Sequence, residues 1–168
     1  MNLRHTFVSV FTAVGLVACG QPAEQGSAEN ETIETVMPAA SNCPAADDSG
    51  NIQVAPGLNA RILKTGYGRS AVKGDYADTN VWLWLYDETA EDRHGQFIWK
   101  SNSVFQFQLG VGQVIKGWDL GVPCMLEGET RELVVSGDLA YGPSGNGEIP
   151  PNATLIFTIE LLKLTAPQ

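Results

Sequence analysis

The side chains that most often carry out acid–base, nucleophilic or metal chemistry are scarce in this sequence. His94 is the only histidine outside the N-terminal segment, so no histidine-based metal cluster and no catalytic triad can be assembled. Two Gly-x-Gly pairs begin at Gly66 and Gly110, but Ala71 and Ile115 stand where a dinucleotide-binding fingerprint needs a third glycine. The sequence therefore predicts no metal site and no cofactor, and His94 is interpreted as a solvated loop residue.

Apolar and aromatic side chains are more informative. From the residues alone, Trp118, Phe105, Phe157 and Tyr141 are interpreted as members of an ordinary aromatic core.

Composition separates an N-terminal part from a folded part. The formal charge of −9 excludes a basic nucleic-acid-binding surface, and six acidic residues without one basic residue fall between residues 20 and 50. Apart from Phe7 and Phe11, every aromatic residue lies between Tyr67 and Phe157. Because 43% of the residues are hydrophobic and only 17% are charged, most of the chain is expected to fold, as one domain at this length.

Residues 1–18 are predicted to be a lipoprotein signal peptide. The apolar stretch over residues 6–17 is long enough for an export signal but too short to cross about 30 Å of hydrocarbon as a helix. It ends in Leu16-Val17-Ala18-Cys19-Gly20, which resembles the bacterial lipobox, where the cysteine is lipidated and becomes the mature N-terminus. The alternative is an ordinary secretory signal with an incidental cysteine. Gln21 in place of Asp favours the outer membrane, by resemblance to proteobacterial sorting rules.

Residues 19–55 are predicted to form an acidic flexible tether that begins at the lipidated Cys19. They are rich in Ala, Glu, Ser and Pro and lack a periodic apolar pattern, so residues 32–37 are interpreted as linker rather than as a weak strand. Once Cys19 is lipidated, Cys43 and Cys124 remain. In an oxidising compartment they form either a disulfide, which would tie the tether to the domain, or two separate thiols.

Residues 56–166 are predicted to form an α+β domain. Strands are expected over residues 59–65, 75–86, 105–109, 129–136 and 153–164, and a short amphipathic helix over residues 114–121. A polar acidic loop is expected at residues 87–95, and a Gly/Pro-rich loop of the kind that carries function at residues 141–152. This order indicates a mostly antiparallel sheet around one helix.

The strand expected over residues 75–86 is apolar on both faces. One face carries Val81 and Leu83, and the other carries Trp82 and Trp84. The second face needs a cover, such as the tether, or else forms an exposed apolar patch.

Three motifs carry a resemblance to a known family. They are Val114-Ile115-Lys116-Gly117-Trp118-Asp119-Leu120-Gly121-Val122, then Asp138-Leu139-Ala140-Tyr141-Gly142, then Ile149-Pro150-Pro151-Asn152-Ala153-Thr154-Leu155-Ile156-Phe157 followed by Glu160-Leu161-Leu162. In this order and spacing they resemble FKBP-type peptidyl-prolyl cis–trans isomerases, the immunophilin family, over roughly residues 57–164. The resemblance implies a curved antiparallel sheet wrapped around one short helix, and rotamase activity on proline-containing polypeptide clients. Together with the export signal, it implies a monomeric folding enzyme of the bacterial cell envelope, lipid-anchored and facing the periplasm.

The chemistry of this family needs neither a nucleophile nor a metal. The barrier to rotation of the planar amide is about 18–20 kcal/mol, and the twisted transition state loses resonance and charge separation. An apolar pocket therefore binds the twisted form better than the planar one. By resemblance, Trp118 is the floor under the proline ring, the Ile115 backbone N–H bonds the substrate carbonyl, and the Tyr141 hydroxyl donates from the rim. The walls implied by the resemblance are Phe105, Val114, Ile115 and Phe157, joined by Phe97, and Ile149 closes the loop side.

Departures from the family pattern fall on its polar pocket residues. Val81 stands where the family has a pocket tyrosine, Ile98 stands where it has a pocket aspartate, and Asn146 lies near a usual histidine. The floor is thus better preserved than the polar groups. Two hypotheses follow: an isomerase weakened by these substitutions, or a non-catalytic FKBP-like chaperone or binding module.

Overall fold

The computed structural model describes residues 43–168, and all structural statements here concern those residues. The predicted signal peptide, the lipidation site Cys19 and the tether up to residue 42 lie outside the described part. Within residues 43–168, no helix combines the length and the apolar character needed to cross a membrane.

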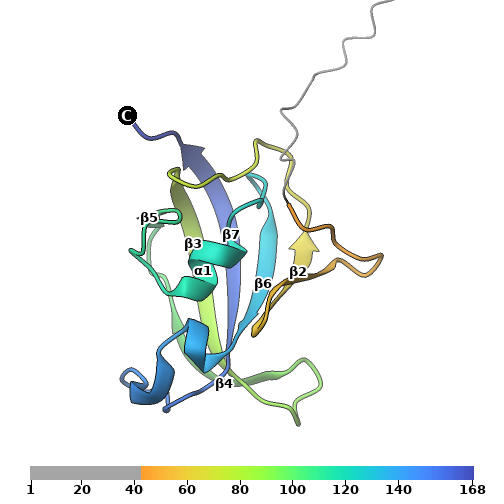
Figure 1. The fold of residues 1–168 in the computed structure, drawn as a ribbon. Coiled ribbons are helices and arrows are strands. Elements are labelled where there is room, and N and C mark those ends of the chain that lie inside the picture. Colours follow the sequence, from red (N-terminus) through yellow and green to blue (C-terminus); the bar gives the residue numbers. More distant parts are fainter. Residues whose placement is uncertain (1–42) are drawn as a thin grey trace, which may run out of the picture. The chain divides into compact units, whose positions relative to one another are not determined.

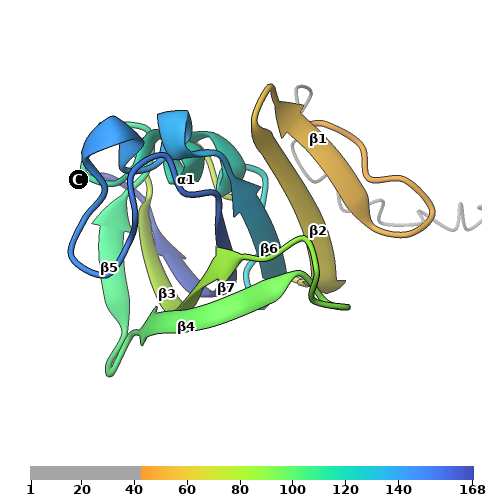
Figure 2. The same cartoon turned by 90° about the horizontal axis from the view of Figure 1, so that it is seen from below.

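An antiparallel sheet of seven strands curves around one short helix, α1 (Figures 1 and 2). The strand order is β1-β2-β6-β7-β3-β4. The strand β4 pairs with the C-terminal half of β3, and β5 pairs with its N-terminal part. The strands are β1 (Asn51–Ala55), β2 (Leu58–Lys64), β3 (Tyr76–Tyr86), β4 (His94–Lys100), β5 (Phe105–Gln108), β6 (Thr130–Val135) and β7 (Leu155–Thr165), the helix is α1 (Lys116–Gly121), and two 3₁₀ turns are η1 (Gly137–Leu139) and η2 (Gly142–Ser144). The predicted α+β class and its architecture are confirmed.

The two longest strands, β3 and β7, lie side by side and form the middle of the sheet. Their pairing sets Val81 opposite Ile159 and Leu83 opposite Phe157. Because side chains alternate between the two faces of a strand, these four residues all point to the concave face, where each is nearly or fully buried. This apolar face is the surface on which α1 rests.

The helix α1 approaches the sheet closely because two of its residues lack side chains. A Cβ atom on Gly121 would lie 2.9 Å from Leu133 of β6, and one on Gly117 would collide with Val135. At the start of the helix, the Asp119 carboxylate accepts hydrogen bonds from the Gly110 and Gly112 backbone N–H groups, at 2.9 and 2.8 Å. The helix and the β5–α1 loop are therefore held as one unit against the sheet.

The folded part begins earlier than the sequence predicts. The strand β1 pairs with β2 although its residues belong to the predicted tether over residues 19–55. The Cys43–Cys124 disulfide, one of the two predicted alternatives, is present and fixes the start of the described chain to the loop after α1. The strand β4 also departs from expectation, since only residues 87–93 of the predicted loop 87–95 lie outside strands.

His94 packs on the outer face of the sheet against Trp84, which corrects the prediction of a solvated histidine. Its ring stands edge-on to Trp84 with a centroid distance of 4.7 Å, and its Nε2 lies 3.3 Å from the Glu132 carboxylate on β6. Beneath this contact Ile156 of β7, which pairs with Trp84, is fully buried. Within the described residues, His94 therefore covers the part of this face around Trp84, and a cover supplied by the tether stays a prediction.

We expect the disulfide to contribute substantially to stability. It joins residues 81 apart in the sequence, and the lost conformational freedom of so long a loop in the unfolded state corresponds to about 4–5 kcal/mol. Replacing both cysteines, Cys43→Ser with Cys124→Ser, should lower the free energy of unfolding by this amount in urea titrations. A reductant should destabilise the wild type but not the double variant. Equal denaturation midpoints for the two proteins would contradict this expectation.

Candidate active site

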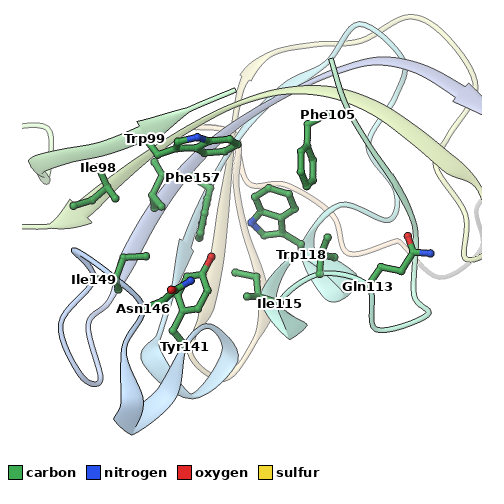
Figure 3. Close-up of a pocket in the computed structure, with 12 residues that line it drawn as sticks. Ile98, Trp99, Phe105, Gln113, Ile115, Trp118, Tyr141, Asn146, Ile149 and Phe157 are labelled. Carbon is green, nitrogen blue, oxygen red and sulfur yellow. The ribbon is translucent and has the colours of Figure 1, made fainter. Parts of the chain in front are cut away.

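An apolar cavity of about 620 Å³ opens between α1, the ends of β4 and β5, and the loop that carries η2 (Figure 3). It is lined by Leu83, Ile98, Trp99, Phe105, Gln113, Val114, Ile115, Trp118, Tyr141, Asn146, Ile149 and Phe157. Eight of these were expected from the sequence: Ile98, Phe105, Val114, Ile115, Trp118, Tyr141, Ile149 and Phe157. A cavity of this size and apolar character suits a small ring or a short apolar segment.

The floor of the cavity is the indole of Trp118, only 5% of which is exposed. Phe157 stands perpendicular to it with a centroid distance of 5.2 Å, Phe105 does the same at 5.9 Å, and Phe107 is tilted against it at 5.3 Å. Edge-to-face contacts of this kind restrict rotation of the ring. Among the described residues, the buried indole N–H has no hydrogen-bond partner. The floor is thus flat, apolar and rigid.

A backbone donor lies beside this floor at the start of α1. Ile115 is the N-cap residue of the helix, with φ −59° and ψ 150°, and its carbonyl accepts hydrogen bonds from Trp118 N–H at 3.0 Å and Asp119 N–H at 3.3 Å. The N–H groups at a helix start have no partner within the helix. Within residues 43–168 no acceptor is assigned to the Ile115 N–H. The helix start therefore offers the cavity a free donor.

Tyr141 supplies the hydroxyl at the rim, as expected. Its side chain points into the cavity with Asn146 beside it (Figure 3). Burial raises the pKa of the Tyr141 hydroxyl above its ordinary value, and the Asn146 amide opposes this only partly. Asn146 is itself fixed by two backbone hydrogen bonds with Ile149, at 3.0 and 2.9 Å. The hydroxyl is thus a neutral donor held in place by a braced loop.

Two predicted wall residues are not in the cavity. Val81 is fully buried in the core, and Phe97 is 48% exposed and packs against Trp84 on the outer face, at 5.6 Å. For Phe97 the cause is an irregularity in the β3–β4 pairing: Leu83 pairs with Trp99 and Trp84 pairs with Phe97, so Ile98 between them has no partner. Such a bulge shifts the alternation of side chains by one position.

The bulge brings Ile98 and Trp99 to the cavity together. Trp99 takes the wall position expected for Phe97, and its ring stands edge-on to Phe105 at 6.3 Å. Leu83 and Gln113 also line the cavity without having been predicted. Leu83 could have been found, since it follows Val81 on the same face. Trp99 could not have been predicted, because the bulge that turns it inward leaves no signal in the sequence.

Known proteins similar to this chain point to the family predicted from the sequence. The family model described as FKBP-type peptidyl-prolyl cis-trans isomerase matches residues 67–162. The chain belongs to the FKBP family. An FK506-binding protein of Neisseria meningitidis serogroup B is 42% identical over 109 residues, 64% of this chain and 96% of that protein. FK506-binding protein 1 of Saccharomyces cerevisiae is 57% identical over 125 residues, 68% of this chain and 94% of that protein.

Solved FKBP-type structures have the same fold. A peptidyl-prolyl cis-trans isomerase from Pseudomonas syringae pv. tomato has a TM-score of 0.59 and 28% sequence identity, and the match covers 69% of this chain and 81% of that one. AtFKBP13 has a TM-score of 0.57 and 34% identity, with 66% and 94% covered. The predicted family is confirmed, and FKBP homologues are peptidyl-prolyl isomerases that bind proline-containing substrates.

We expect the Tyr141 donor to keep its proton through the alkaline range. Because its pKa lies above the usual value of 10.0, the rate of prolyl isomerisation should stay constant from neutral pH to about pH 10 and fall only beyond it. Tyr141→Phe should lower kcat/KM by about tenfold, the typical effect of losing one hydrogen bond. Exchange NMR on a proline peptide measures both. A wild-type rate that declines with a midpoint well below pH 10 would contradict this assignment.

Proposed function

We propose that this chain is an active prolyl cis–trans isomerase that assists the folding of exported proteins at the periplasmic face of a bacterial envelope. The activity rests on one observation: a chain of the FKBP family has a rigid indole floor in an apolar cavity with a free backbone donor and a neutral hydroxyl. The Cys43–Cys124 disulfide supports an oxidising compartment, since such bonds are rare in reducing ones.

The geometry favours the twisted amide over the planar one. A proline ring lying on Trp118 places its preceding amide among Phe105, Phe157 and Ile98, where a polar planar amide is poorly solvated. The twisted amide has less charge separation and loses less on entering the cavity. The Ile115 N–H holds one substrate carbonyl, and the Tyr141 hydroxyl donates to the carbonyl that rotates. No step requires the enzyme to gain or lose a proton.

We expect the rate to be lower than in relatives that have the full polar set. Ile98 lines the cavity at the position of the family's aspartate, so no carboxylate opposes Tyr141 there. Val81 lies in the core and contributes nothing to the cavity directly. Since the transition state is less polar than the ground state, an aliphatic wall preserves the preference of the cavity for the twisted amide. It does not help to orient the substrate carbonyl.

The place of action follows from the N-terminal sequence. Leu16-Val17-Ala18-Cys19-Gly20 supports lipidation at Cys19 after export, and Gln21 favours the outer membrane. A terminus with several acyl chains stays in a membrane stably, at about 0.8 kcal/mol per buried methylene group. We infer a lipid-anchored monomer whose folded domain faces the periplasm and acts on unfolded polypeptides.

A non-catalytic chaperone is the second candidate. It is favoured by Trp99 and Phe105, which are 40% and 36% exposed at the cavity mouth and could hold apolar segments without isomerising them. The two candidates differ in one measurement, the rate of isomerisation.

We expect the wild type to accelerate cis–trans exchange of a short proline peptide well above background. Trp118→Phe, which shrinks the floor, should lower kcat/KM by about tenfold or more. Leu120→Ala is the matched control, because Leu120 lies on the same helix and is 40% exposed, away from the cavity lining. FK506, for which the relatives are named, should compete with the peptide. Exchange at the background rate, together with suppressed aggregation of an unfolded client, would favour the chaperone instead.

We expect Cys19→Ser to release the protein from membranes. The wild type should sediment with the envelope fraction and show a diacylglyceryl mass on an N-terminal cysteine, whereas the variant should appear in the soluble periplasmic fraction. Cys43→Ser serves as the control and should remain with the membrane. An unmodified mature N-terminus at any other residue would overturn the anchor.

A further inference from the structure

We propose that the open edge of β4 is a docking strand, along which an extended stretch of client polypeptide pairs by its backbone while its proline occupies the cavity. This inference rests on the proposed function, because it names how the client of that same cavity is held.

The strand β4 lies at one end of the sheet order and pairs with β3 alone among the described strands (Figure 2). A strand in this position presents backbone donors and acceptors that its own sheet does not use. Peptide recognition by strand addition depends on such an edge. The same strand supplies Ile98 and Trp99 to the cavity lining, so a chain that leaves the cavity passes the edge.

The two edges of the sheet differ in how they are protected. The edge strand β1 exposes Asn51 and Gln53, and Pro56 follows it. The strand β4 exposes Phe97 and Trp99, by 48% and 40%, together with Gln96 and Lys100, and it contains no proline. Lysines, prolines and bulges are the usual means by which edges are kept from pairing, and β4 has one lysine and a bulge. What distinguishes β4 from β1 is its pair of exposed aromatic side chains, one of which also lines the cavity.

The occupant that fits is an unfolded client rather than a second copy of this chain. Two copies joined through β4 would bring together two strands that contain no proline, so this pairing would leave both cavities without a proline. An extended client that pairs with β4 can place its own proline in the cavity where Ile98 and Trp99 turn inward. The exposed Val104 and Phe105 after β4 continue the apolar surface for the client's side chains.

The experiment is an N-methyl scan of a nine-residue peptide with one central proline. Strand pairing engages every second amide on each side, so N-methylation should weaken binding by about tenfold at alternate positions and little at the positions between. Phe97→Lys should weaken binding of the nine-residue peptide and leave turnover of a four-residue proline peptide unchanged. Leu63→Lys, at an exposed leucine of β2, is the control and should change neither.

The outcomes separate this inference from the proposed function. Failure to isomerise the four-residue peptide overturns the proposed function, whatever the scan gives. Normal turnover of that peptide with no alternation in the scan, or with equal losses in Phe97→Lys and Leu63→Lys, overturns the docking strand alone. Amide hydrogen exchange should show added protection of residues 94–100, at the amides that do not pair with β3, when the long peptide is present. Protection that rises with protein concentration in its absence would assign the edge to a second copy and also overturn the proposal.

Discussion

The packing of Trp118 against three phenylalanine rings is the interaction on which the rest of the structure depends. A helix as short as Lys116–Gly121 has no stability of its own, so it exists only because tertiary contacts hold it. The rings of Phe105, Phe107 and Phe157 come from β5 and β7, and closing the sheet around the helix brings them together on one indole. The same contact completes the core and makes the floor of the cavity. The floor is therefore as rigid as the fold.

The two ends of α1 differ in how their backbone groups are hydrogen-bonded. At its C-terminal end, the buried Arg131 donates hydrogen bonds to the carbonyls of Gly121, at 3.0 Å, and Cys124, at 3.4 Å, and pairs with Glu129 at 2.7 Å. A buried ion pair is costly unless its remaining groups are satisfied, and here the helix carbonyls satisfy them. The disulfide holds the same segment. At the N-terminal end Asp119 ties the helix to the β5–α1 loop, and within residues 43–168 no partner is assigned to the Ile115 N–H. The donor without an assigned partner thus belongs to a residue that lines the cavity.

How far the sequence predicts this molecule depends on how strictly its patterns repeat. The alternation over residues 105–109 and 153–164 predicts β5 and β7 because each has one buried face, and the motifs identify Trp118 and Tyr141 because local spacing fixes them. The strand β1 was missed because it is only five residues long, adjoins the acidic polar segment before it, and gains its partner only from β2. The sequence predicted Phe97 in the cavity wall where the structure has Trp99, because a one-residue bulge is a property of two paired strands and not of one. His94 was misplaced for the same reason, since its contacts lie on β3 and β6.

The bulge in β4 also explains how a member of this family can lose polar groups and keep a usable cavity. By turning Ile98 and Trp99 inward together, it fills the wall with apolar surface where relatives of the predicted pattern place a carboxylate. An ionised carboxylate without a partner in such a wall would lose much hydration free energy, whereas isoleucine and tryptophan carry no charge to desolvate. The remaining side-chain donor must then be uncharged to avoid the same cost. The Tyr141 hydroxyl meets this condition, and burial raises its pKa further above the neutral range. Apart from Gln113, Asn146 and Tyr141, the side chains that line the cavity are apolar. In the proposed mechanism, the contrast between this apolar lining and two donors favours a twisted bond over a planar one.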